Sequence, residues 1–229
     1  MLELNRPRIL ESIKARKTVY LIAAYLVLLF CLRLFTNPYQ FSVDDNVWYW
    51  ILGLLSLAYL AYVEKQRNIP FRFVDRVEPK WFYGGYCVIA VCASVIIVRL
   101  FLVMFHLSGI PVYSIVVHSG NDVFGIVGYA IVVAIDEESF KVALTNFCTK
   151  ILGTRGKKIE GLTIKITGTL SVALWAYLHV LVGHHSTGYA MIAFAVGIVY
   201  FLIILYLKNY LPTTAAHAIW NVAIDFGFL

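Results

Sequence analysis

Seven apolar segments dominate this chain and constrain its fold more than any other feature. They cover residues 18–35, 47–63, 81–105, 123–149, 166–182, 189–207 and 211–229. A helix that crosses the hydrocarbon core of a bilayer needs about 20 residues, so each segment is long enough to cross. The sequence therefore predicts an all-α fold, a polytopic membrane helix bundle of about seven transmembrane helices, which forms a single integral membrane domain over residues 1–229.

The composition supports a membrane protein over a soluble one. Hydrophobic residues make up 61% of the 229 residues, charged residues make up only 14%, and the mean hydropathy is +0.79. Soluble domains are nearer to half apolar and about a quarter charged. The net charge of +6 would suggest nucleic-acid binding in a soluble protein. Basic residues retained on the cytoplasmic side of a membrane explain it here, so no nucleic-acid partner is expected.

Basic loops and loops without basic residues alternate between the apolar segments. The basic loops are 1–17, 64–80 and 150–165, and the loops without Lys or Arg are 36–46, 106–122 and 183–188. Cytoplasmic loops of membrane proteins carry an excess of Lys and Arg. The alternation predicts a multi-pass protein of the cell membrane with a cytoplasmic N-terminus, whose first segment is an uncleaved span.

Three consecutive acids, Asp136, Glu137 and Glu138, interrupt the fourth apolar segment. A carboxylate at membrane depth is costly unless it is paired, hydrated or protonated. Lys141 lies four residues after Glu137, in the order that favours an ion pair on one helix face, which predicts a pair between these two side chains. A structural ion pair would need only one acid, so the sequence indicates a functional site.

Histidines occur in two further apolar segments. His179 lies in the fifth, where a lone histidine is more often a satisfied core residue than a catalyst. In the seventh, His217 and Asn221 are four residues apart on one helix face, and Asp225 extends that face by another turn. Such a pair also has a structural use in interhelical hydrogen bonds. The remaining histidines lie in or beside the loops without basic residues and are expected to be solvated: His106, His118, His184 and His185.

A count along straight helices, at about 1.5 Å of rise per residue, compares the depths of these side chains. In a hydrocarbon core about 30 Å thick, Glu137 and His217 both lie about 21 Å below the outer face. The same count places His179 roughly 10 Å too high to meet them. Glu137 and His217 are therefore predicted to be level, and His179 fits least well.

A carboxylate, two imidazoles and an amide can hydrolyse an acyl bond without a nucleophilic side chain. A glutamate removed from water becomes a better general base, because desolvation disfavours its charged form. It can take a proton from a water molecule that attacks a carbonyl. Histidine and asparagine side chains can then donate hydrogen bonds to the developing oxyanion. Substrate would reach this site laterally or from the cytoplasmic face.

The motifs that carry this chemistry resemble those of the CPBP family, which contains type II CAAX prenyl endopeptidases and bacteriocin-processing or immunity-related membrane proteases. The matching motifs are Glu137-Glu138, Trp175-x-x-x-His179 and His217-x-x-x-Asn221. The family's first motif reads EExxxR, whereas this chain has Val142 at the arginine position and its cation at Lys141. That spacing is similar to the PrsW-type membrane proteases. The resemblance covers residues 123–229, the predicted catalytic core.

The resemblance implies a membrane-embedded endopeptidase that uses no metal and no other cofactor. Its partners would be the lipid bilayer and a membrane-associated or lipidated peptide or protein substrate. A prenylated C-terminal peptide, a leader peptide and a membrane-anchored regulator all fit. By the family's roles, Glu137 would activate water with the help of His179. His217 and Asn221 would form the oxyanion site, and Glu138 would be a second essential acid. The supporting residues would be Asp136, Lys141 and Asp225.

Three other functions stay open at the level of sequence. A zinc-dependent membrane protease could ligate zinc through His179, His217 and a glutamate, although an HExxH motif is absent. A non-catalytic scaffold or assembly subunit, such as the seven-span subunit of the gamma-secretase complex, could use membrane histidines to hold a complex together. A proton-coupled transporter would also use acids and histidines, but the sequence shows no internal repeat of the kind that transporters carry.

Overall fold

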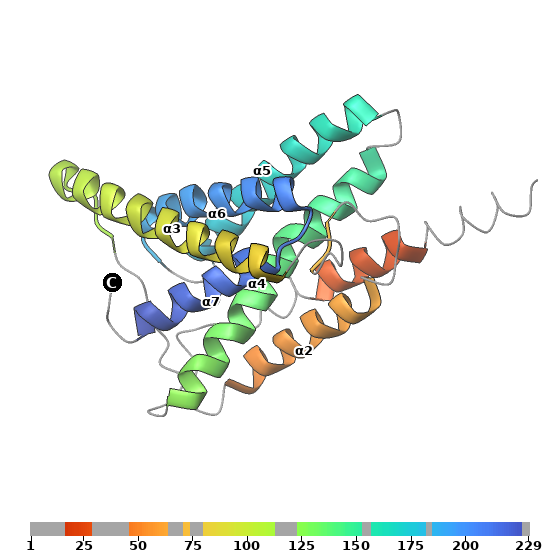
Figure 1. The fold of residues 1–229 in the computed structure, drawn as a ribbon, viewed down its shortest axis with the longest axis horizontal. Helices are drawn as coiled ribbons and strands as arrows, with labels where there is room; N and C mark the ends of the chain where they lie inside the picture. The colour runs from red at the N-terminus through yellow and green to blue at the C-terminus, as the bar shows by residue number, and fades with distance from the viewer. Residues whose placement is uncertain are drawn as a thin grey trace, which may run out of the picture.

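The computed structural model describes residues 17–28, 46–63, 71–73, 80–112, 123–152, 157–181 and 185–225. Within these ranges the secondary structure is helical, as predicted, apart from one isolated bridge between Arg72 and Asn209. An unlabelled helix over Lys17–Leu28 comes first. The labelled helices that follow are α2 (Asn46–Val63), α3 (Lys80–Ser108), α4 (Val123–Leu152), α5 (Lys157–Leu181), α6 (Thr187–Leu207) and α7 (Leu211–Asp225) (Figure 1). Each helix covers one of the predicted apolar segments in whole or in part.

Three of the described helices are long and apolar enough to cross a membrane. They are Trp81–Ser108 within α3, Gly161–Leu181 within α5 and Thr187–Leu207, which is α6. These helices give the chain the character of a membrane protein. The count of about seven spans and the cytoplasmic N-terminus stay predictions.

The fifth helix begins earlier than the apolar segment that predicted it. That segment starts at residue 166, whereas α5 starts at Lys157. Hydropathy marks the part of a helix that suits lipid and does not mark where the helix begins. Lys, Glu and Leu are good helix formers, so the polar stretch 157–165 extends the same helix.

The fourth helix is central to the fold. It contacts α2, α5 and α7, while α3 contacts α6 and α7. In Figure 1, α4 (green) runs diagonally across the bundle, with its first half beside α2 and its second half beside α5. Because the helices cross at an angle, positions at the same depth are not given by counting residues from their ends.

Two clusters of buried apolar side chains hold the helices together. The first includes Val142 of α4 and Phe201 of α6. The second includes Val98 of α3 and Ala216 of α7, again with side chains of α6. Since α6 contributes to both clusters, it joins the α3–α7 side of the bundle to the α4–α5 side.

A tight turn between α6 and α7 sets the start of the last helix. Lys208 takes a left-handed conformation (φ 57°), and its N–H closes the final turn of α6. The Asn209 side chain accepts a hydrogen bond from the backbone N–H of Leu211 at 2.8 Å, which caps the start of α7. Extended residues 71–73 lie against this turn and pair with it through Arg72 and Asn209. The turn thereby fixes the register in which α7 presents its side chains to α4.

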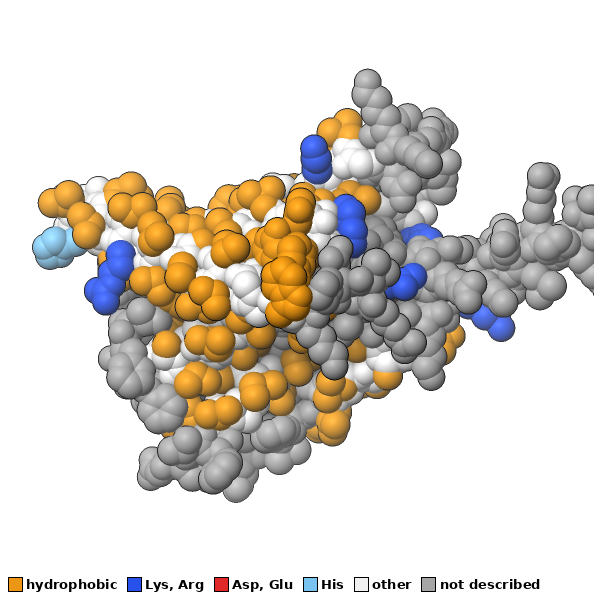
Figure 2. All heavy atoms as spheres, in the orientation of Figure 1, with side chains coloured by type: hydrophobic (Ala, Val, Ile, Leu, Met, Phe, Trp, Pro, Cys, Tyr) orange, Lys and Arg blue, Asp and Glu red, His pale blue; other side chains and the backbone are white. Residues whose placement is uncertain are grey.

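The face of the molecule seen in Figure 2 is largely apolar. Exposed hydrophobic side chains cover α3 and its neighbours. At the two ends of α3, Trp81 is 78% exposed and Leu107 is 81% exposed. A surface with this much exposed apolar area suits contact with lipid acyl chains.

Candidate functional site

The three consecutive acids of α4 face different neighbours, because successive residues on an α-helix are rotated by about 100°. Asp136 meets α2, Glu137 meets α5 and α7, and Glu138 meets α7. Their exposed fractions are 3%, 8% and 0%, respectively. Carboxyl groups this deeply buried need a charged partner, hydrogen-bond donors or a proton. The three acids have different sets of partners.

Glu137 is the acid on which two histidines converge. The indole N–H of Trp175 donates a hydrogen bond to its Oε2 at 3.0 Å. His217 Nε2 lies 3.4 Å from Oε2, and His179 Nε2 lies 3.9 Å from Oε1. Trp175 and His179 are one turn apart on α5, whereas His217 comes from α7. Three helices thus bring together Glu137, His179 and His217, which the sequence had placed in separate apolar segments.

The predicted mismatch in the depth of His179 is wrong. The count along straight helices separated it from Glu137 by roughly 10 Å, but the structure places the two side chains 3.9 Å apart. The count assumed parallel helices that start at the membrane face. α4 instead crosses the bundle diagonally (Figure 1), so the count along it overstates how far Glu137 lies below the outer face.

The protonation of His179 follows from its backbone partner. Its Nδ1 is 2.9 Å from the carbonyl oxygen of Trp175. A carbonyl oxygen only accepts, so Nδ1 carries the proton and neutral His179 presents the lone pair of Nε2. That lone pair faces Oε1 of Glu137 at 3.9 Å, which is too long for a direct hydrogen bond. A gap of this length between two acceptors suits a bridging water molecule that donates to both.

Glu138 is held by short contacts. Lys141 Nζ lies 2.6 Å from its Oε1, so the predicted pairing of Lys141 with Glu137 is wrong. Residues three apart on a helix also share a face, and here the ammonium lies 3.9 Å from the centroid of the Trp175 ring. A cation is attracted to the face of an indole, so the ring helps to direct Lys141 toward Glu138.

His217 lies between the two glutamates. Its Nδ1 is 2.9 Å from Glu138 Oε1, and an ionised carboxylate only accepts, so Nδ1 carries a proton. Neutral His217 therefore presents the lone pair of Nε2 to Glu137 at 3.4 Å. The predicted oxyanion role requires a proton on Nε2 as well. His217 can fill that role in its imidazolium form.

The buried polar groups around Glu137 reach zero net charge when they bind one additional proton. We call this group the carboxylate cluster; it comprises Glu137, Glu138, Lys141, Trp175, His179 and His217. Two carboxylates and one ammonium leave a net charge of −1 while both imidazoles are neutral. An uncompensated charge is costly in a buried site. A proton shared among Glu137, His179 and His217 removes that charge and supplies a donor between Glu137 Oε2 and His217 Nε2, which lie 3.4 Å apart. Such a proton belongs to the set of coupled groups and not to one residue.

Of the supporting residues predicted from sequence, Lys141 belongs to this cluster, whereas Asp136 faces α2. Asp136 accepts a hydrogen bond from the Ser56 hydroxyl of α2 at 3.0 Å. Asn221 is half-buried on α7 and makes no hydrogen bond with the described part of the chain. Asp225 is the last residue of α7, and its side chain lies outside what the structure describes.

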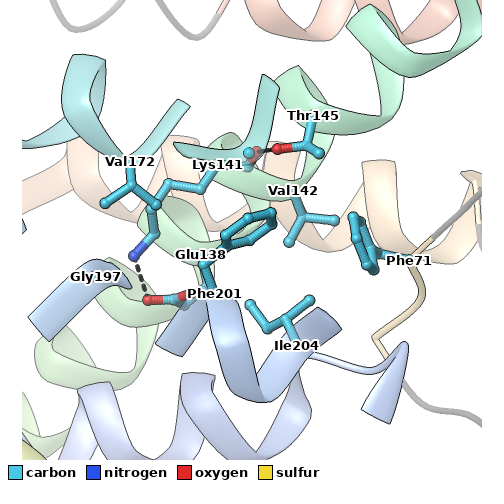
Figure 3. Close-up of a pocket in the computed structure, with 10 residues that line it drawn as sticks. Phe71, Glu138, Lys141, Val142, Thr145, Val172, Gly197, Phe201 and Ile204 are labelled. Atoms are coloured by element: carbon cyan, nitrogen blue, oxygen red, sulfur yellow. Dashed lines mark hydrogen bonds and ion pairs between the residues drawn. The ribbon is translucent and has the colours of Figure 1, made fainter. Parts of the chain in front are cut away.

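A small hollow borders Glu138 (Figure 3), and Glu137 is not among the residues that line it. Glu138 and Lys141 line it together with apolar side chains that include Phe71, Phe201 and Ile204. Its size is about that of one water molecule. The second carboxylate oxygen of Glu138, Oε2, has no hydrogen-bond partner among the described residues. A water molecule in the hollow is the natural partner for such an oxygen.

Two residues near the site were missed or misread from sequence. Trp175 was noted only as the aromatic member of a motif, whereas its indole N–H contacts Glu137. His185 was expected to be solvated, but it is only half-exposed, and its ring stacks on Tyr189 with centroids 4.5 Å apart. Its ring centroid also lies 5.6 Å from that of His179. The shortness of the 183–188 loop is the signal that could have placed His185 beside the end of α5.

Neither a search for metal-binding clusters nor comparison with known proteins assigns a function to this site. Among the residues that the structure describes, no group of three or more His, Cys, Asp or Glu side chains is arranged to hold a metal ion. A scan of protein families and searches of curated proteins and of solved structures gave no match to this chain. The resemblance to the CPBP family stays a prediction from its motifs.

Proposed function

We propose that the chain is an intramembrane peptidase of CPBP type, a multi-pass protein of the cell membrane with about seven spans and a cytoplasmic N-terminus. It hydrolyses a peptide bond of a membrane-associated or lipidated protein or peptide. Glu137 is the general base that activates water. The chain's own residues carry the reaction, with no metal ion and no other cofactor.

One observation carries the proposal: the Oε1 of Glu137 faces the Nε2 lone pair of His179 across 3.9 Å. A water molecule between them donates one O–H to the carboxylate and the other to the imidazole. Its oxygen lone pairs are then free to attack a carbonyl carbon. The buried surroundings add to the effect, because electrostatic interactions are stronger where bulk water is excluded.

The reaction then runs in two steps whose protons balance. Glu137 takes a proton from water as the water oxygen bonds to the carbonyl carbon, and the carbonyl electrons move onto its oxygen. The C–N bond breaks next, and the proton passes from Glu137 to the leaving nitrogen, which gives a carboxylic acid and an amine. His217 as imidazolium and the amide of Asn221, one helical turn away, donate to the oxyanion.

The test compares membranes from cells that produce the wild-type chain with membranes that carry Glu137→Gln, by mapping protein termini. Removal of a general base is expected to lower the rate by about 10²- to 10⁴-fold, so the dependent termini disappear. Ser108→Ala, a change at the exposed end of α3 where the hydroxyl donates to the Met104 carbonyl, serves as the control and keeps them. Unchanged cleavage by Glu137→Gln contradicts the proposal.

The same membranes separate two of the other functions, the zinc-dependent protease and the non-catalytic scaffold. A zinc-dependent protease would lose activity in a strong chelator, whereas the glutamate mechanism predicts full activity there. A non-catalytic scaffold would show the same termini in both membranes. For a scaffold, Glu137→Gln would instead disrupt a protein complex, which a native gel or crosslinking would detect.

A further inference from the structure

Trp175 of α5 is a buried side chain, 4% exposed, that contacts four ionisable residues. Its indole N–H donates to Glu137, and its ring face receives the ammonium of Lys141. Its ring meets the imidazoles of His179 and His217 edge-on, with centroids 4.6 Å and 5.8 Å away. One side chain therefore links groups from α4, α5 and α7.

We propose that Trp175 is a positioning residue whose indole N–H selects the oxygen of Glu137 that reacts. The inference rests on the proposed peptidase function. The N–H holds Oε2 at 3.0 Å, so the carboxylate cannot rotate freely and Oε1 stays turned toward His179. The water to be activated is thus bound by Oε1, the oxygen that faces His179 Nε2 at 3.9 Å.

Trp175 contacts Glu137 and Lys141 through different parts of its indole ring. The N–H at the ring edge serves Glu137, whereas the π face serves Lys141 and, through it, the ion pair with Glu138. The backbone carbonyl of Trp175 accepts from His179 Nδ1 at 2.9 Å. A Trp175→Phe substitution keeps the ring face and the carbonyl and removes only the N–H, so it isolates the positioning contact.

The contact is tested first without any enzyme assay. With ¹⁵N-labelled tryptophan in detergent micelles, the five tryptophans each give an indole N–H signal, and Trp175→Phe identifies the one from Trp175. Glu137→Gln is expected to shift that signal, because an amide oxygen is a weaker acceptor than a carboxylate. Asp136→Asn is the matched control, since Asp136 faces α2, and leaves the signal in place.

The consequence for the reaction is tested with a peptide whose cleavage depends on Glu137. Trp175→Phe is expected to lower kcat roughly 10- to 100-fold, the effect of losing one hydrogen bond to a charged group. KM is expected to stay unchanged, because Trp175 holds Glu137 and not the substrate. Trp81→Phe, the same change at an exposed position on α3, leaves kcat unchanged.

Either of two results overturns the positioning role: an indole signal that does not respond to Glu137→Gln, or a wild-type kcat for Trp175→Phe. If Trp175→Phe does not fold, the Glu137→Gln spectrum still decides, because one indole signal moves or none does. A wild-type chain that cleaves nothing overturns the peptidase function and the kinetic role with it. If the wild-type chain cleaves the peptide but the indole signal does not respond to Glu137→Gln, only the positioning role is overturned.

Discussion

Glu137 and Glu138 are the same residue type at adjacent positions of one helix, yet their surroundings are opposite. Glu138 is 0% exposed, and both of its partners are close, Lys141 at 2.6 Å and His217 at 2.9 Å. Glu137 is 8% exposed, and its two imidazole neighbours lie farther away, at 3.4 Å and 3.9 Å. Glu138 is paired with the permanent charge of Lys141, whereas Glu137 faces two imidazoles, which can gain or lose a proton. Under the proposed function, Glu138 supports the site and Glu137 carries the chemistry.

The largest effect on stability is expected from Glu138→Gln. This change leaves the ammonium of Lys141 buried without its counter-charge, which costs about 3–5 kcal/mol of unfolding free energy. Glu137→Gln keeps an acceptor for the Trp175 N–H and leaves the Lys141–Glu138 ion pair intact, so it is expected to cost about 1 kcal/mol or less. Chemical unfolding of both variants in mixed micelles gives the difference. Equal losses for the two variants would remove the distinction between the acids.

The second prediction concerns the ion pair as a unit. Adding Lys141→Met to Glu138→Gln removes the stranded cation and leaves an apolar side chain against the Trp175 ring, where a thioether packs well. The double variant is expected to recover about 2–3 kcal/mol relative to Glu138→Gln alone, because replacing a whole buried pair is far less costly than breaking it. The same unfolding experiment measures this coupling. A double variant less stable than Glu138→Gln would show that Lys141 has a different anchor.

The third prediction concerns the closed packing on the Glu138 side. A Cβ atom at Gly168 of α5 would overlap the ring of Phe201, which lines the hollow beside Glu138. Gly168→Ala is therefore expected to destabilise the protein by about 1–3 kcal/mol. Gly161→Ala on the same helix meets nothing within 4 Å and is expected to stabilise it by about 0.5–1 kcal/mol, because alanine is the better helix former. Thermal unfolding in detergent distinguishes the two signs, and a loss at both positions would contradict the packing argument.

Much of the fold and part of the site could be predicted from the sequence. Long apolar runs predicted the helices because hydropathy and helix length are local properties, and the type and spacing of polar residues singled out Glu137, His179 and His217. The crossing of α4 over its neighbours was not predictable, since helix angles depend on how side chains pack between helices. The straight-helix count for His179 therefore failed.

Which partner each polar group chooses also depends on contacts between helices. Positions three and four residues from Lys141 both offered a glutamate on the same face. The choice of Glu138 follows from the Trp175 ring of α5 and from His217 of α7, neither of which is near in sequence. The contact between the Trp175 indole and Glu137 could not be predicted for the same reason. A sequence motif identifies the aromatic residue but not the direction of its N–H.

A smaller effect than that of Glu138→Gln is expected at the third acid, where the comparison can be extended. Asp136 is as buried as its neighbours, but its described hydrogen bond comes from a neutral hydroxyl, that of Ser56, which also lies 2.9 Å from Tyr25 Oη. Ser56→Ala removes one neutral donor and strands no opposite charge, and Asp136 keeps its other contacts. The expected loss is about 1–2 kcal/mol, measured by chemical unfolding in the same micelles, with cleavage unchanged. A loss as large as that of Glu138→Gln would mean that burial alone, and not the charge of the partner, determines what each acid contributes to stability.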